Sequence, residues 1–133
     1  MKNTDLCKKA IAALENSYSP YSNYRVGAAL LCKNGKIYTG CNIENASFSP
    51  TICAERVAFS KAVSEGEREF DAIAIAGKKE LALVPFSPCG VCRQFMSEFC
   101  TPDFTVLVIT GEDTYSEYTL GSLLPDSFSI KEN

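Results

Sequence analysis

The sequence contains no histidine among its 133 residues. This absence excludes the serine–histidine and cysteine–histidine pairs on which many hydrolases depend. It also excludes every zinc site that uses an imidazole ligand, and it removes the commonest acid–base group of neutral pH. Hydrolytic chemistry on this chain must therefore rest on carboxylates, on thiolates, or on a metal that thiolates hold.

Long apolar runs and basic runs are also missing. No apolar stretch reaches the roughly 18 residues of a membrane helix, and the polar start of the chain does not look like a signal peptide. Thirteen basic against sixteen acidic residues give a net charge of −3, which disfavours a general electrostatic grip on nucleic acid. We expect a cytoplasmic protein that binds neither membranes nor nucleic acid.

The length and composition are those of one globular domain. A chain of 133 residues is close to the length of about 150 residues typical of a domain. Its 46% hydrophobic and 22% charged residues are ordinary for a folded protein. We therefore treat residues 1–133 as a single domain.

The apolar periodicity predicts helices alternating with strands. We expect a helix at 4–16 capped by Asn3 or Thr4. A second helix should start at Pro88 with Ser87 as its cap, and its apolar face should include Val91, Phe95, Met96 and Phe99. The other expected elements are a hairpin of strands 26–31 and 37–43 around an Asn-Gly turn, a helix at 53–63, strands at 70–76, 104–109 and 114–118, and a short helix at 120–124. This order predicts an α/β fold with a mixed sheet of about five strands flanked by helices.

The seven cysteines divide into two groups. Cys53, Cys89 and Cys92 stand at the starts of expected helices, where unpaired N–H groups and the helix dipole favour a thiolate. The remaining four lie singly in expected helices and strands, and we interpret them as packing residues: Cys7, Cys32, Cys41 and Cys100.

A Cys-x-x-Cys pair such as Cys89 and Cys92 has more than one interpretation. It could be a redox pair of the thioredoxin kind. A structural zinc site normally has four protein ligands, and only three cysteines are well placed here. Three protein ligands with one open position are typical of catalytic zinc, so we expect one Zn²⁺ per chain.

Two charged residues follow Cys53 closely. Glu55 is the candidate acid–base group, because zinc-assisted hydrolysis needs a base and histidine is absent; alternatively it is a solvated glutamate of the first helical turn. Three thiolates and Zn²⁺ sum to −1, and Arg56, three residues after Cys53, could offset that charge. The alternative for Arg56 is an ordinary surface charge.

These residues resemble the zinc deaminase signature in its three-cysteine form. More of the chain is similar to the small, homotetrameric cytidine deaminases, over about residues 5–128. The matching segments are YSNYRVGAA at 21–29, GCNIENA at 40–46, CAER at 53–56, SPCGVCRQ at 87–94 and LLP at 123–125. The resemblance implies a three-layer α/β/α fold and a homotetramer.

The resemblance also implies roles for individual residues. Cys53, Cys89 and Cys92 would bind zinc, and Glu55 would shuttle protons. Asn42 and Glu44 would hydrogen-bond the sugar 3′-hydroxyl, although a polar pair at the end of a strand is the plain alternative. The base would be contacted by the Tyr24 ring, by the backbone N–H of Ala54 and the carbonyl of Ser87, and by Phe128 of an adjacent subunit.

Two aromatic positions depart from the family pattern. Tyr24 stands where the family usually has phenylalanine, and Phe48 stands where it often has tyrosine. For each aromatic, ordinary core or interface packing is a rival interpretation. These departures concern affinity for the substrate rather than the reaction.

The expected reaction is the hydrolytic deamination of cytidine and 2′-deoxycytidine to the uridines and ammonia, in pyrimidine salvage. Glu44 would repel a phosphate, which favours a nucleoside over a nucleotide. The rivals are another small aminopyrimidine such as a blasticidin-like nucleoside antibiotic, an RNA- or DNA-editing deaminase, and a non-catalytic zinc or redox module.

Overall fold

The computed structural model describes residues 2–131. Its helices are α1 (Asn3–Ala13), α2 (Ala54–Ser64), α3 (Gly90–Phe99) and α4 (Leu120–Leu123), with a 3₁₀ turn at Leu14–Asn16. Its strands are β1 (Tyr24–Cys32), β2 (Ile37–Cys41), β3 (Phe70–Lys79), β4 (Ala82–Val84), β5 (Thr105–Gly111) and β6 (Thr114–Thr119). Within residues 2–131, no helix combines the length and the apolar character that crossing a membrane requires.

The strands form one mixed sheet in the order β2-β1-β3-β5-β6, with β4 paired to β3. Only β3 and β5 are parallel among the strands described, and α3 lies in the connection between them. The predicted mixed sheet is confirmed, but it has six strands rather than about five. The additional strand is β4, three residues that pair antiparallel with β3 after the turn at Glu80. The φ of Glu80 is 57°.

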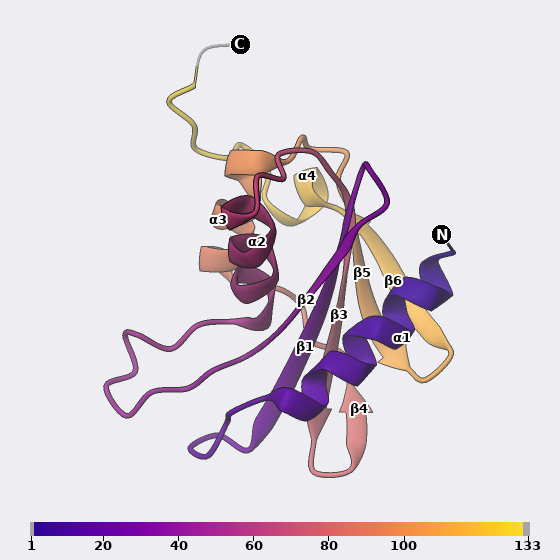
Figure 1. The fold of residues 1–133 in the computed structure, drawn as a ribbon, viewed down its shortest axis with the longest axis vertical. Helices are drawn as coiled ribbons and strands as arrows, with labels where there is room; N and C mark the ends of the chain where they lie inside the picture. The colour runs from indigo at the N-terminus through magenta and orange to yellow at the C-terminus, as the bar shows by residue number, and fades with distance from the viewer. Residues whose placement is uncertain (1, 132–133) are drawn as a thin grey trace.

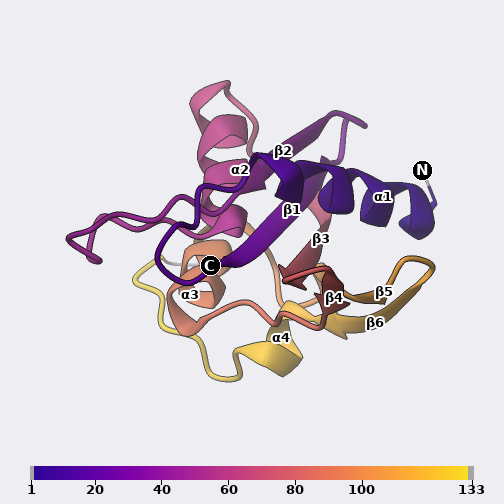
Figure 2. The same cartoon turned by 90° about the horizontal axis from the view of Figure 1, so that it is seen from below.

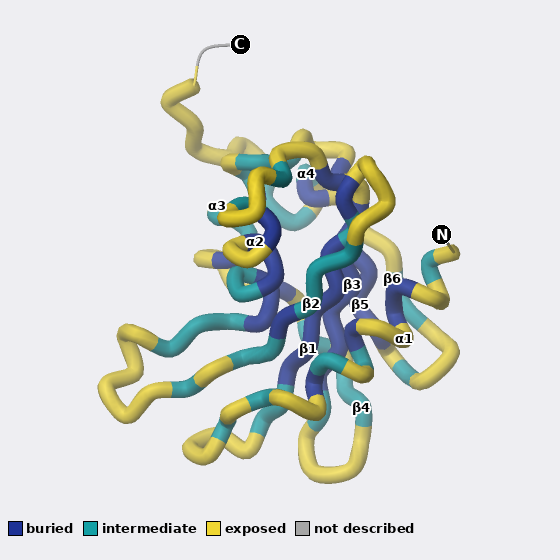
Figure 3. The backbone as a smooth tube through the Cα atoms, viewed as in Figure 1, coloured by how far each residue is buried: buried dark blue, intermediate teal, exposed yellow. Residues whose placement is uncertain are grey.

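Helices cover both faces of the sheet, so the predicted three-layer arrangement is confirmed (Figures 1 and 2). Successive side chains of a strand point to opposite faces, and on β3 the isoleucines 73 and 75 face α2 and α3 while alanines 72, 74 and 76 face α1. The small alanine side chains let α1 lie close to its face of the sheet. The deeply buried residues lie along the central strands and the inner sides of the helices (Figure 3).

Gly40 fixes the position of α2 against the sheet. A Cβ atom at Gly40 would lie 2.5 Å from the Ala54 carbonyl oxygen and 2.6 Å from the Ala58 nitrogen. Both are backbone atoms, so no side-chain movement could relieve the contact. The absence of a side chain on β2 therefore lets the first turn of α2 pack directly on the sheet.

The predicted starts of two helices are wrong. The cap of α1 is Lys2, without a side-chain hydrogen bond, rather than Asn3 or Thr4. The cap of α3 is Cys89 rather than Ser87, because the Cys89 sulfur accepts a hydrogen bond from the Cys92 N–H at 3.4 Å.

The predicted apolar face of α3 is confirmed at three of its four positions. Phe95, Met96 and Phe99 face inward, together with Cys92. The prediction is wrong for Val91, which is 61% exposed. The buried side of α3 therefore begins at the metal-ligand candidate Cys92 rather than at Val91.

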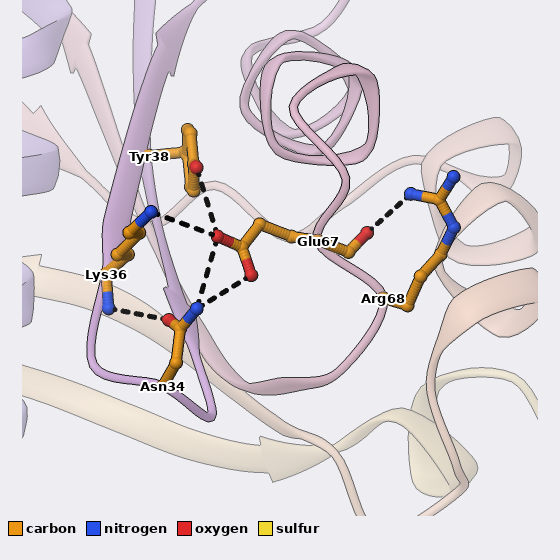
Figure 4. A network of polar contacts seen from close by, with 5 residues as sticks. All are labelled: Asn34, Lys36, Tyr38, Glu67 and Arg68. Atoms are coloured by element: carbon orange, nitrogen blue, oxygen red, sulfur yellow. Dashed lines mark hydrogen bonds and ion pairs between the residues drawn. The ribbon is translucent and has the colours of Figure 1, made fainter.

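The α2–β3 connection is tied to the β1–β2 hairpin by the Glu67 carboxylate (Figure 4). It accepts hydrogen bonds from Asn34 Nδ2 at 2.9 and 3.2 Å and from the Tyr38 hydroxyl at 3.2 Å, and Lys36 Nζ lies 3.9 Å away. Arg68 donates to the Glu67 carbonyl at 2.8 Å. These contacts hold the far end of α2, so both ends of this helix are fixed to the sheet.

Candidate active site

Three sulfur atoms gather where α2 and α3 begin. Cys53 directly precedes α2, Cys89 caps α3, and Cys92 lies in the first turn of α3. Their Sγ atoms all lie within 4.8 Å of one another. The structure thus brings together the three cysteines that the sequence analysis selected.

The spacing of the sulfur atoms fits a metal ion. Tetrahedral zinc with Zn–S bonds of about 2.3 Å holds its sulfurs about 3.8 Å apart. The Cys53 and Cys89 Sγ atoms are 3.8 Å apart. Three thiol donors suit catalytic zinc, which has three protein ligands and keeps its fourth position for water or substrate.

Hydrogen bonds lower the pKa of the Cys53 thiol. A hydrogen bond with Cys92 is the main cause that lowers the pKa of Cys53 to about 5, and Arg56 and Cys89 assist. The same hydrogen bond raises the pKa of Cys92. Arg56 Nη2 donates to the Cys53 sulfur at 3.5 Å, so Arg56 is directed at the cysteine cluster rather than at solvent.

Glu55 is fully buried, which is uncommon for an ionisable side chain. Neither of its carboxylate oxygens has a hydrogen-bond partner within the described part of the chain. Burial raises the pKa of Glu55 to about 7. A buried carboxyl group without partners is costly, and such a group next to a cysteine cluster fits a site that receives a metal and a polar substrate.

The Glu55 side chain faces a cavity of about 90 Å³. Cys53, Ala54 and Asn42 line the same cavity, so four of the predicted site residues meet there. The other lining residues were not predicted: Val26, Thr51, Ile52 and Phe86. The cavity is small and largely apolar.

Phe86 packs on Tyr24, with ring centroids 5.2 Å apart and planes inclined at 55°. Gly77 of β3 makes room for both rings, because a Cβ there would lie 2.8 Å from Phe86 Cβ and 3.3 Å from Tyr24 Cε1. Tyr24 thus has a partner inside its own subunit. The glycine in an otherwise apolar strand was the one sequence signal of this close approach.

A wider cleft of about 380 Å³ opens next to this cavity, and Thr51 lines both. It lies between the segment before β1 and the segment after β2, which a bridge between Tyr18 and Ile43 joins. Glu44 lines the cleft, as do Tyr21, Ser22, Asn45 and Phe48. Phe48 is 74% exposed and belongs to the segment between β2 and α2, which extends from the body of the molecule (Figure 1).

Hydrogen bonds hold both predicted sugar-binding side chains. Asn42 Oδ1 accepts from Ser17 Oγ at 2.5 Å and from the Val26 N–H at 2.9 Å, and its Nδ2 donates to the Tyr24 carbonyl at 2.8 Å. Glu44 accepts from the backbone N–H groups of residues 21 and 22 and from the Ser22 hydroxyl. Burial acts to raise the pKa of Glu44, but these hydrogen bonds outweigh it and the pKa lies below its usual value.

Three predicted substrate-binding residues line neither of these cavities in the single chain: Tyr24, Ser87 and Phe128. Ser87 is exposed, and its hydroxyl accepts from Arg93 Nη2 at 2.9 Å. Phe128 is 71% exposed in the C-terminal segment, where its carbonyl accepts from Gln94 Nε2 at 3.1 Å.

The other four cysteines lie apart from the cluster. Cys7 and Cys32 are buried in the cores on opposite faces of the sheet, and burial raises the pKa of each to about 11. Cys41 and Cys100 are half-buried, and burial raises the pKa of Cys100 to about 12. Thiols with these pKa values stay protonated at neutral pH, as expected of packing residues.

Residues 1–108 match the family model described as the cytidine and deoxycytidylate deaminase zinc-binding region. The chain belongs to this deaminase family. Zinc is therefore the metal cofactor, and the cysteine cluster is the possible metal site that the structure offers within the described residues.

Named deaminases resemble this chain along most of its length. It is 50% identical to a cytidine deaminase of Sporosarcina psychrophila, over 90% of this chain and 86% of that protein. It is 46% identical to the cytidine deaminase of Halalkalibacterium halodurans, over 96% and 94% of the two chains. The crystal structure of a cytidine deaminase from Burkholderia pseudomallei superposes with a TM-score of 0.89 at 43% identity, covering 96% of this chain and all of the other.

Proposed function

We propose that this deaminase hydrolyses cytidine and 2′-deoxycytidine to uridine and 2′-deoxyuridine with release of ammonia, as a step of pyrimidine salvage. The observation that carries the proposal is Glu55, a fully buried carboxyl group without partners in the described residues, which faces a small cavity beside three thiols. The names of the similar proteins support the same activity.

Cys53, Cys89 and Cys92 hold the zinc ion in this proposal. When bound, zinc supplies a Lewis acid that makes water a nucleophile near neutral pH. The helix N-termini at Cys53 and Cys89 stabilise the thiolates. The Arg56 guanidinium at the Cys53 sulfur offsets the excess negative charge of three thiolates, and the metal charge remains available to the reaction.

Glu55 moves the protons. It takes a proton from the attacking water, gives one to N3 of the ring as C4 becomes tetrahedral, and carries one to the departing amine. A pKa of about 7 suits a group that must both accept and donate near neutral pH. Burial raises this pKa, and the nearby Arg56 charge acts to lower it, so both protonation states of Glu55 are accessible near neutral pH.

The base lies in the small cavity and the sugar in the wider cleft. Tyr24 stacks on the base, and the Ala54 N–H and the Ser87 carbonyl contact its edge. Asn42 and Glu44 bind the 3′-hydroxyl. Glu44 has a lowered pKa and so carries a negative charge at neutral pH, which repels a phosphate and favours a nucleoside.

The working enzyme is a homotetramer of single-domain chains in this proposal, and Phe128 of one copy closes the site of another. Exposed aromatic side chains at Phe48 and Phe128 support it, because large exposed apolar groups are typical of interaction sites. Seven free thiols suit the reducing cytoplasm. Light scattering should show a tetramer, and a fully active monomer would contradict this part.

A substrate panel tests the function. Loss of cytidine absorbance is measured with cytidine, 2′-deoxycytidine, cytidine 5′-monophosphate, blasticidin S and single-stranded oligonucleotides, with ammonia and uridine quantified in parallel. We expect turnover of both nucleosides and at least tenfold lower kcat/KM for the nucleotide, equivalent to about 1.4 kcal/mol. A preference for blasticidin S or for oligonucleotides would overturn the assignment, and no turnover at all would indicate a non-catalytic zinc module.

A further inference from the structure

The two oxygens of the Glu44 carboxylate accept different numbers of hydrogen bonds. Oε1 accepts from the Tyr21 N–H at 3.0 Å and from the Ser22 N–H at 3.1 Å. Oε2 accepts from Ser22 Oγ at 2.5 Å. Since each carboxylate oxygen accepts about two hydrogen bonds, Oε2 keeps one acceptor position for a ligand.

The Ser22 hydroxyl makes two hydrogen bonds with opposite roles. It donates to Glu44 Oε2, and it accepts from the Tyr24 N–H at 3.0 Å. Among the described residues, Ser22 is the only side chain that hydrogen-bonds Glu44. One oxygen atom therefore joins the carboxylate of the sugar cleft to the backbone of the residue whose ring packs on Phe86.

We propose that Ser22 is a positioning residue for the substrate sugar: its hydroxyl holds the Glu44 carboxylate in the rotation that presents the free position of Oε2 to the 3′-hydroxyl. This inference rests on the proposed function. Without the hydroxyl, the two backbone N–H groups still hold Oε1, but the carboxylate plane can turn and Oε2 is no longer fixed. Binding must then also order the carboxylate, and this lowers affinity.

The hydrogen bonds of Ser22 are exposed in the single chain. Exposed contacts of this kind contribute little to folding because water replaces them. We therefore expect Ser22→Ala to fold with a melting temperature close to that of the parent protein. A substrate that covers Glu44 removes this water, so the effect of the substitution falls on binding.

The test is a kinetic comparison of Ser22→Ala, Ser22→Thr and the control Ser19→Ala, each on cytidine and on 3′-deoxycytidine. Ser19 lies in the same segment, and its hydroxyl oxygen lies 3.1 Å from Ser17 Oγ and makes no hydrogen bond with Glu44. We expect Ser22→Ala to raise KM for cytidine about 3- to 10-fold, the effect of one hydrogen bond, with kcat unchanged. For 3′-deoxycytidine, which lacks the hydroxyl, KM should change by no more than about twofold.

Two further results are expected. Ser22→Thr keeps a hydroxyl and should restore KM for cytidine to within about twofold, and Ser19→Ala should stay within the same range on both substrates. Ser22→Ala combined with Glu44→Gln should be no worse than Glu44→Gln alone.

An equal fall in kcat/KM on both substrates would overturn the inference, because it would mark a general structural role. An unchanged KM for cytidine in Ser22→Ala would overturn it as well. Failure of the proposed function looks different: the parent protein itself would then bind zinc and leave cytidine intact. If Ser22→Ala does not fold, Ser22→Cys takes its place, because a thiol is a weak hydrogen-bond donor. Its KM values for the two substrates are then compared with those of Ser22→Thr in the same way.

Discussion

The two ends of the candidate active site are built in different ways. At the metal end, Cys92 and Glu55 are fully buried and belong to the first turns of helices that pack on the sheet. At the sugar end, Tyr21, Ser22 and Phe48 are exposed and belong to irregular segments. In Figure 3 the segments before β1 and after β2 are mostly yellow, and the central strands beside them are dark blue.

The difference separates two requirements of one reaction. Proton transfer beside a metal needs fixed geometry and little water, which burial on helices and strands provides. Recognition of a sugar hydroxyl needs access from solvent, which loops provide, and their side chains must then be positioned by hydrogen bonds such as those on Asn42 and Glu44. Substitutions at the metal end should therefore remove catalysis, and substitutions at the sugar end should change affinity.

The largest effect is expected from Cys92→Ala. Losing one of three zinc ligands should abolish metal binding at stoichiometric zinc, and activity with it. Zinc content by atomic absorption and the rate of uridine formation check this. Cys41→Ala is the control, since Cys41 lies outside the cluster and its loss should leave one zinc per chain. Full activity of a zinc-free Cys92→Ala protein would show that the reaction does not need the metal.

Glu55→Gln should have the next largest effect. The amide fills the same space but cannot move a proton, so kcat should fall by about 10²–10⁴-fold, the usual contribution of a general acid–base group. Zinc content and the dissociation constant for cytidine should change little, as calorimetry would show. A variant that retained near-normal turnover with zinc bound would assign the proton transfers to another group.

Glu44→Gln should have a moderate effect confined to binding. Loss of a charged acceptor should raise KM for cytidine about tenfold, with kcat within about twofold of the parent value. Initial rates over a range of substrate concentrations separate the two constants, and Glu112→Gln in the β5–β6 turn serves as the control. A large fall in kcat with KM unchanged would erase the distinction between the two ends of the site.

Tyr24→Phe should have the smallest effect. The structure shows the Tyr24 ring packed on Phe86, and phenylalanine keeps this ring. Melting temperature and kcat/KM should therefore stay close to the parent values, with kcat/KM within about twofold. A loss of tenfold or more would show that the Tyr24 hydroxyl itself contacts the substrate.

The sequence predicted the metal end better than the sugar end. Cys53 lies close to Glu55 in the sequence, and Cys89 lies close to Cys92, so each pair was found at the start of an expected helix. The 36 positions between Cys53 and Cys89 are bridged only in the folded chain. The start of α3 was misplaced because a cysteine sulfur, which is not a usual capping group, accepts the capping hydrogen bond there. Of its predicted apolar face, Phe95, Met96 and Phe99 are confirmed and only Val91 is wrong.

At the sugar end, the important contacts join residues far apart in the chain. Ser22 contacts Glu44 across 22 positions, and Tyr24 packs on Phe86 from another strand connection. No periodicity links such pairs, so only the folded chain shows them. The strand β4 was missed because three residues are too few for an alternating pattern to be recognised.

The most direct test of the central claim is a zinc titration of metal-free protein. A chelator removes the metal, zinc is returned in fractions of an equivalent, and the initial rate of uridine formation from cytidine is measured after each addition. We expect no activity without zinc, a linear rise of the initial rate with added zinc, and a sharp end point at one zinc per chain. Full activity of the metal-free protein, or an end point at a different ratio, would contradict that claim.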